Sequence, residues 1–277
     1  MPRVRVQLRR ELKPATTIHF AHANGFPAPC YSKLFRALGD EYHVDYIDTL
    51  GHDDAYPVTE NWKLLVKQLL HHLETHFCVP VIGVGHSLGG VLTFLAAVYR
   101  PDLFSAIILL DSPVYGRFKS HVIKALKLFG FMDKVSPAGR TQTRRQHWPT
   151  PEAAFEYLRE KTVFADFDTD CLWDYVNYGM AHDEEGVCLR FERDIEYKIY
   201  QTFPHNLYRY RTRLKVPAAL LYGEHSHVIQ AGDAKNMARK LPMALHQVRG
   251  GHLFPFEYPE YTAEQIKHVI EQLCSQK

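Results

Sequence analysis

The sequence lacks the cysteine pattern of a disulfide-bonded or zinc-binding protein. Its 277 residues include five cysteines, an odd number, and no two of them form a Cys-x-x-Cys pair. Seventeen histidines are present, but the clusters at 71–72 and 225–227 lack the His-Glu-x-x-His spacing of a helical metal site. We therefore expect reduced thiols, no bound metal and no cofactor.

Long apolar runs and an excess of one charge are also missing. No stretch approaches the roughly 18 consecutive apolar residues of a membrane span. Residues 1–14 are basic but lack the apolar segment of a secretory signal. The 33 basic and 31 acidic side chains leave a net charge of +2, too little to indicate nucleic acid as a partner. We expect a cytoplasmic protein with no membrane span and no nucleic-acid partner.

Apolar strand patterns alternate with helical patterns along much of the chain. Residues 3–8 (RVRVQL) alternate with a period of two, which predicts a strand. Residues 79–85 (VPVIGVG) form a continuous apolar run, typical of a strand covered on both faces of a parallel sheet. A helical pattern follows at 89–101. This alternation predicts an α/β fold with a mostly parallel central sheet flanked by helices.

The alternation stops after the apolar run at 104–113 and returns only at 216–225. Helical patterns dominate the interval, so we predict a helical cap inserted after the sixth strand. The predicted domains are a core made of residues 1–114 and 211–277, and a cap (lid) made of residues 115–210. The cap contains eighteen of the chain's thirty-five aromatic residues, enough to line an apolar pocket as well as a small core of its own.

One Gly-rich turn follows the apolar strand, in the stretch VIGVGHSLGGVL (81–92). A dinucleotide-binding turn would need a third glycine where Leu88 stands, and a phosphate-binding P-loop would need a lysine where Val91 stands. Both phosphate-binding interpretations therefore fail. Gly-x-Ser-x-Gly is complete, with Ser87 at its centre, between a predicted strand and a predicted helix. This context predicts a nucleophile elbow.

A serine nucleophile needs a base that takes its proton. In the order expected for an elbow of this kind, the base is a histidine late in the chain. His252 lies in the stretch RGGHLFPFEYPE, between the last predicted strand and the last predicted helix. We predict that His252 is the general base for Ser87.

These motifs resemble the α/β-hydrolase superfamily, in its capped, esterase-like branch. GHSLGG and GGHLFPFEYPE are similar to its nucleophile and histidine regions. HANGFPA (22–28) resembles its His-Gly-x-Pro turn, and DTLGHDDAYP (48–57) resembles its Gly-His loop. The resemblance covers most of residues 15–114 and 212–277, whereas the cap is matched only in general character.

The resemblance implies an oxyanion hole built from two backbone N–H groups. One would belong to Leu88, the residue after the serine. The other would belong to Phe26, if Gly-Phe-Pro is aligned with Gly-x-Pro, although Asn24 stands where the family often has histidine.

The resemblance leaves the acid of the triad open. The family usually places it after the strand PAALLYG, but the two expected positions hold Ser226 and His227. Glu224 is acidic and lies early in the same turn. The family's other placement, at the end of the preceding strand, implies Asp111. Asp111, Glu224 and a further acid or two-residue arrangement therefore remain alternatives.

We expect a serine hydrolase that cleaves a small to medium carboxylic ester through an acyl-enzyme. The same triad would serve a thioesterase, a carbon–carbon bond hydrolase or a cofactor-free perhydrolase. A further alternative is a non-catalytic, ligand-binding homologue of such hydrolases. The expected partner is a small-molecule ester or acyl substrate. A second copy of the chain, forming a homodimer, is the other candidate partner.

Overall fold

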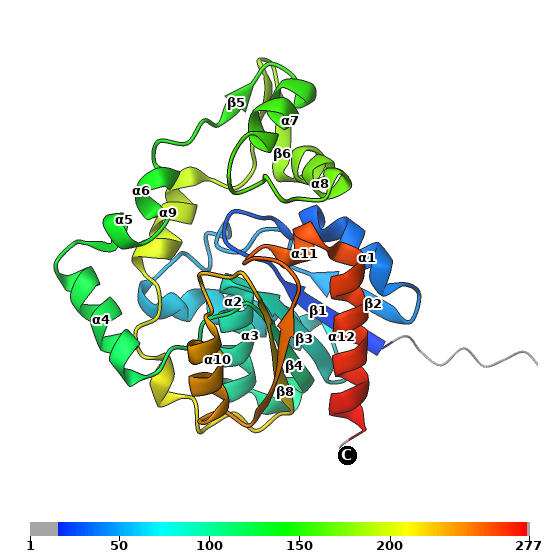
Figure 1. Cartoon of the computed structure of the whole chain (residues 1–277), viewed down its shortest axis with the longest axis vertical. Coiled ribbons are helices and arrows are strands. Elements are labelled where there is room, and N and C mark those ends of the chain that lie inside the picture. Colours follow the sequence, from blue (N-terminus) through cyan, green and yellow to red (C-terminus); the bar gives the residue numbers. More distant parts are fainter. Residues whose placement is uncertain (1–15, 276–277) are drawn as a thin grey trace, which may run out of the picture.

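Six parallel strands form the central sheet of the computed structural model, which describes residues 16–275 (Figure 1). Their spatial order is β2-β1-β3-β4-β8-β9. The bounds are Thr16–Ala21 for β1, Tyr42–Tyr46 for β2, Val81–His86 for β3, Phe104–Leu110 for β4, Ala218–Gly223 for β8 and Met243–Val248 for β9. The parallel sheet is the architecture that the apolar runs predicted. The strand predicted at residues 3–8 lies outside the described residues.

Helices cover both faces of this sheet, with a buried apolar cluster under each layer. One layer consists of α1 (Ser32–Leu38) and α12 (Pro259–Cys274), together with the short α11 (Phe254–Glu257). The other consists of α2 (Lys63–His76), α3 (Leu88–Tyr99) and α10 (Ala231–Ala238). Because β3 lies at the centre and is covered on both faces, all six of its residues are buried.

A long segment separates β4 from β8 and forms the upper and left parts of Figure 1. Its helices are α4 (Arg117–Leu128), α5 (Met132–Val135), α6 (Ala138–Thr141), α7 (Pro151–Arg159), α8 (Thr169–Gly179) and α9 (Arg193–Gln201). It follows β4, the fourth described strand. The sequence predicted its position after a sixth strand, whereas the described residues show four strands of the central sheet, β1 to β4, ahead of it.

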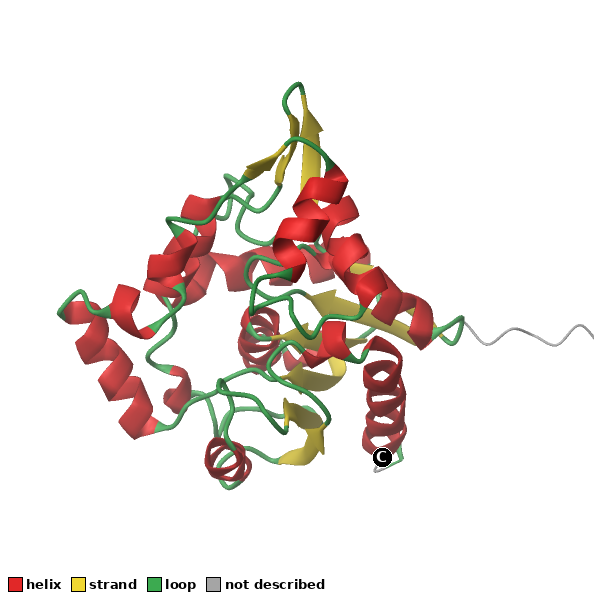
Figure 2. Cartoon of the chain, turned by 45° about the horizontal axis from the view of Figure 1, so that its top comes forward, coloured by secondary structure: helices red, strands yellow, loops and turns green. Residues whose placement is uncertain are grey.

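The segment between β4 and β8 also contains a small antiparallel sheet in the order β5-β7-β6 (Figure 2). Its strands are β5 (His147–Trp148), β6 (Met180–Asp183) and β7 (Gly186–Leu189). Strands of two to four residues are too short to show a period of two, so the sequence predicted only the helices.

None of the described helices is long and apolar enough to cross a membrane.

Candidate active site

Ser87 lies at a sharp corner between β3 and α3. Its backbone has φ 51° and ψ −111°, a conformation that costs free energy in any residue with a side chain. The surrounding glycines are required by space. A Cβ at Gly89 would lie 2.0 Å from the carbonyl oxygen of Ala21, and one at Gly85 would lie 2.5 Å from the backbone of α3. The corner is the strand–turn–helix geometry that Gly-x-Ser-x-Gly predicts.

His252 and Asp111 meet at the same end of the sheet. Asp111 directly follows β4, and His252 lies in the loop after β9. His252 Nδ1 and Asp111 Oδ2 are 2.7 Å apart, and the Asp111 side chain is fully buried. Glu224 is exposed, and its carboxylate faces His225 at 3.7 Å. Of the two predicted acids, the structure therefore brings Asp111 to the histidine and leaves Glu224 at the surface.

Two further donors hold the Asp111 carboxylate in place. The Gly223 N–H donates to Oδ1 at 3.1 Å, and the Ser226 hydroxyl donates to Oδ2 at 2.6 Å. With His252 as the third donor, both oxygens of this buried carboxyl group have hydrogen-bond partners although the group is out of contact with water. Asp111 itself has φ 44°, so the backbone is strained at Asp111 as well as at Ser87.

The direction of the Ser226 hydrogen bond follows from its neighbours. The N–H groups of Val228 and Ile229 donate to Ser226 Oγ at 3.1 and 3.2 Å. Since the oxygen already accepts two hydrogen bonds, its own proton is directed to Asp111. Ser226 occupies one of the positions where the family usually has its acid. The sequence showed this departure but could not show that the serine meets the acid on the neighbouring strand.

His86, the variable residue of the elbow motif, connects the elbow to the histidine loop. It is fully buried, and burial holds the pKa of its ring well below the usual value. His86 Nε2 lies 2.9 Å from the carbonyl oxygen of His252, and Nδ1 lies 2.8 Å from the Tyr31 hydroxyl. A carbonyl can only accept, so Nε2 carries the proton and Nδ1 accepts from Tyr31.

This polar chain continues from Tyr31 to the turn after β1, because the Ala23 N–H donates to the Tyr31 hydroxyl at 3.2 Å. The turn, the elbow and the histidine loop are thereby joined by buried hydrogen bonds. Sequence reasoning missed His86 and Tyr31. The only signal was a histidine inside a buried strand, where an apolar residue is more usual.

The two predicted oxyanion donors differ in their present partners. Leu88 is the first residue of α3, so its N–H has no acceptor within the helix. The Phe26 N–H donates to the carbonyl of Ala23 at 3.2 Å and closes the turn. Binding of an oxyanion by Phe26 would require this hydrogen bond to be shared or exchanged.

Among residues 16–275, the hydrogen bonds of His252 go to Asp111 and His86, and the Ser87 hydroxyl is not a partner. The ring centroids of His86 and His252 are 5.2 Å apart, which places His252 beside the elbow. Hydrogen bonds between a nucleophile and its base are often long in unliganded enzymes and shorten when the substrate binds.

Aromatic side chains surround the turn next to the elbow. The ring of Phe26 lies 5.2–6.2 Å from those of Phe164, Phe167, Tyr175 and Phe256. Three of these four come from the segment between β4 and β8, and Phe256 follows the His252 loop. The segment therefore packs on the turn that carries one predicted oxyanion donor, and it brings apolar surface to this end of the sheet.

A parallel sheet with a serine at the strand–helix corner and a histidine–aspartate pair beyond it defines the α/β-hydrolase class of folds. The alpha/beta hydrolase family matches residues 20–265, and the chain belongs to this family. The "Uncharacterized hydrolase YugF" of Bacillus subtilis is 27% identical over 262 residues, 90% of this chain and 88% of the relative.

Other relatives carry hydrolase and receptor names. The chain is 28% identical over 138 residues to the "Monoglyceride lipase" of Mus musculus, 46% of each chain. It is 21% identical over 281 residues to the "Karrikin insensitive 2 receptor IA" of Petunia hybrida, 94% of this chain and 92% of the relative. Among solved structures, E-2-(acetamidomethylene)succinate hydrolase superposes with a TM-score of 0.75 at 19% identity, covering 93% of this chain and 91% of that chain.

Proposed function

We propose that the protein is a serine hydrolase that cleaves a small to medium carboxylic ester through an acyl-enzyme on Ser87. The observation that carries this proposal is the 2.7 Å contact between His252 Nδ1 and buried Asp111, at the same end of the sheet as the strained serine. A histidine held by a buried carboxylate is the arrangement that activates a serine hydroxyl for acyl transfer.

In the proposed mechanism, Ser87 Oγ attacks the ester carbonyl carbon while His252 Nε2 takes the hydroxyl proton. The resulting imidazolium is stabilised by Asp111, and the oxyanion is bound by the Leu88 N–H and, after exchange of its turn hydrogen bond, by the Phe26 N–H. His252 then donates its proton to the leaving alcohol. In the second half, His252 takes a proton from a water molecule while the water oxygen attacks the acyl carbonyl carbon. The bond from that carbon to Ser87 Oγ then breaks, and His252 returns the proton to Ser87 Oγ as the carboxylic acid leaves.

We propose the segment 115–210 as a cap over a core of residues 1–114 and 211–277. Its packing on the Phe26 turn supports this division. The aromatic rings there favour an apolar acyl group over a charged one, because burying a charge among them would be costly. Thioester, carbon–carbon and perhydrolysis chemistry would use the same triad, so substrate tests should include these classes.

A second candidate function is ligand binding without turnover, which the similarity to a protein named as a receptor favours. The two functions differ in what a ligand does. A hydrolase converts an ester, whereas a receptor is stabilised by a ligand that it leaves intact.

The test is a panel of p-nitrophenyl esters of increasing chain length, with acyl-CoA thioesters beside it, against the wild type and Ser87→Ala. Ser275→Ala, at the exposed end of α12, is the matched serine control. We expect ester turnover in the wild type and the control, and loss of about 10⁶-fold in kcat for Ser87→Ala. Equal turnover by Ser87→Ala would exclude the proposed nucleophile. No turnover, with a ligand-induced rise in melting temperature, would establish the receptor function.

A further inference from the structure

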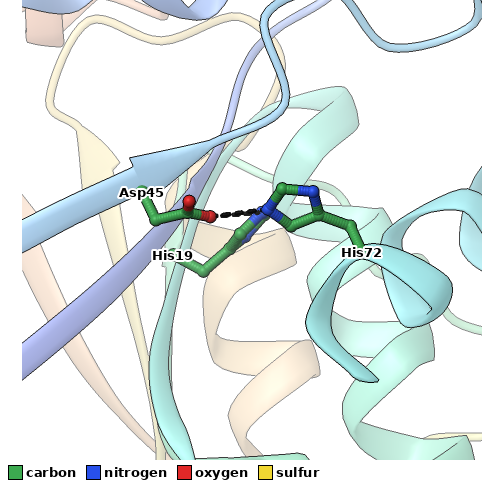
Figure 3. A group of neighbouring side chains, drawn as sticks. All are labelled: His19, Asp45 and His72. Atoms are coloured by element: carbon green, nitrogen blue, oxygen red, sulfur yellow. Dashed lines mark hydrogen bonds and ion pairs between the residues drawn. The ribbon is translucent and has the colours of Figure 1, made fainter. Parts of the chain in front are cut away.

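Three side chains from three different elements converge at the edge of the sheet. Figure 3 shows His19 of β1, Asp45 of β2 and His72 of α2 pointing toward one another. His19 and Asp45 are register partners on neighbouring parallel strands, so both project from the same face. Asp45 Oδ2 lies 2.6 Å from His72 Nε2 and 3.9 Å from His19 Nε2. The proposed triad uses none of these residues.

His19 is the unexplained member of this group. It is 1% exposed, and within residues 16–275 neither of its ring nitrogens has a hydrogen-bond partner. Buried polar side-chain atoms in proteins are almost always paired, and an exception requires an explanation, of which a bound ion is one. The 3.9 Å between His19 Nε2 and the Asp45 oxygen is too long for a hydrogen bond. The ring nitrogen therefore faces a carboxylate without bonding to it.

We propose that His19, Asp45 and His72 form a binding site for Zn²⁺ or a divalent transition metal ion with similar ligand preferences. Two imidazoles and one carboxylate are the donor set that Zn²⁺ accepts. Bonds of about 2.0–2.1 Å in a tetrahedral site place ligand atoms roughly 3.3 Å apart. The distances of 2.6 and 3.9 Å lie on either side of this value, and all three ligand atoms lie within 4.8 Å of one another.

The accessibility of the three side chains suits a cation site. His19 is enclosed, and both of its ring nitrogens are free of hydrogen bonds among residues 16–275. Asp45 and His72 remain partly exposed, which gives the ion an entry path and a water as the fourth ligand.

The site would join β1, β2 and α2 at the sheet edge, so its expected effect is on stability. The sequence predicted no metal because the three ligands lie far apart in the chain and show no local spacing. A second group, His147, Asp183 and Cys188 in the small sheet, is equally close-packed but more exposed. Unlike His19, none of its members is a buried side chain without a hydrogen-bond partner in the described part of the chain, so this group serves here only as a competitor.

The test uses full-length protein, without a histidine tag, treated with a chelator and then dialysed against Zn²⁺ or Co²⁺. We expect one tightly bound ion per chain, a rise in melting temperature, and Co²⁺ absorption bands typical of four- or five-coordination. Asp45→Asn and His72→Gln should each lose the ion. His71→Gln, the neighbouring exposed histidine on α2, and His147→Gln should keep it. Binding that persists in both Asp45→Asn and His72→Gln, or no binding by the wild type, would overturn the proposal.

A measurement on the wild type alone covers the case in which the variants do not fold. Crystals soaked in Zn²⁺ should show an anomalous-scattering peak between His19, Asp45 and His72. A peak only at His147–Asp183–Cys188, or only at surface histidines, would contradict the assignment.

Discussion

Two histidine–aspartate pairs in this protein have nearly the same bond length and different surroundings. His252 lies 2.7 Å from Asp111, and His72 lies 2.6 Å from Asp45. Asp111 follows a strand end, is fully buried and accepts from three donors. Asp45 lies within a strand and remains partly exposed.

The third group beside each pair differs as well. Next to His252 is the strained corner with Ser87. Next to Asp45 is the ring of His19, which has no hydrogen-bond partner in the part of the chain that the structure describes. A histidine–aspartate contact by itself thus defines no chemistry. A serine at a strand end suits the first pair to the proposed proton transfer, and a second imidazole suits the other to the proposed binding of a cation.

The two pairs should differ most when each aspartate is neutralised in turn. Asp111→Asn should lower kcat for a p-nitrophenyl ester by about 10⁴-fold, because the amide holds His252 in the wrong tautomer. Asp45→Asn should leave kcat within about twofold, since that pair lies outside the proposed triad. Steady-state kinetics on both folded variants tests this. Similar losses in the two variants would mean that Asp111 has no special role.

Both regions contain buried histidines, and these should make the free energy of unfolding depend on pH. Burial lowers the pKa of His19 to about 3 and that of His22 to about 4, and it holds that of His86 well below its usual value. Below the unfolded-state pKa of about 6.5, the unfolded chain binds protons that the folded chain does not. Stability should therefore fall as the pH decreases from 6.5 toward 4.

At pH 5, His19 and His22 should each lower the free energy of unfolding by about 2 kcal/mol relative to pH 7.5. Burial raises the pKa of Glu196 and Glu257, which opposes this loss only where those groups titrate. Urea unfolding with a chelator present measures the difference. Equal stability at pH 7.5 and pH 5 would show that the buried histidines are not held neutral.

Ser226→Ala removes a hydrogen-bond donor to Asp111 that has no counterpart at Asp45. We expect kcat to fall by about tenfold, because a hydrogen bond to a charged group is lost. Ser226→Thr keeps the hydroxyl and should restore kcat. Steady-state kinetics and urea unfolding of both variants test this, and a loss of stability with unchanged kcat would indicate a purely structural serine.

Glu224→Gln should have the smallest effect. Its carboxylate is exposed and directed at His225, so kcat should stay within about twofold of the wild type. A loss of kcat comparable to that of Asp111→Asn would make Glu224 a member of the triad. It would contradict the assignment of Asp111 as the acid.

The sequence predicted those parts of the site that lie in a local pattern. The position of Ser87 at a corner follows from its own neighbours, and the parallel sheet follows from continuous apolar runs. The choice between Asp111 and Glu224 depends on which strand end faces the His252 loop, which no local pattern records. Ser226 acts across two strands, so its contact was also invisible in the sequence.

Other features escaped prediction for different physical reasons. The small sheet β5-β7-β6 is built from strands too short to show periodicity. The Phe26 N–H donates a hydrogen bond within its own turn. The sequence did not show this bond, because it depends on backbone geometry and because the turn departs from the family's pattern at Asn24. His19, Asp45 and His72 come together only because β1, β2 and α2 pack side by side.

The most direct test of the central claim is peptide mass spectrometry after reaction with a fluorophosphonate. The proposed triad predicts one adduct per chain, located on Ser87, formed rapidly in the wild type and at least about 10³-fold more slowly in Asp111→Asn. An adduct on another residue, or the same labelling in Ser87→Ala, would contradict the claim that this corner holds the nucleophile.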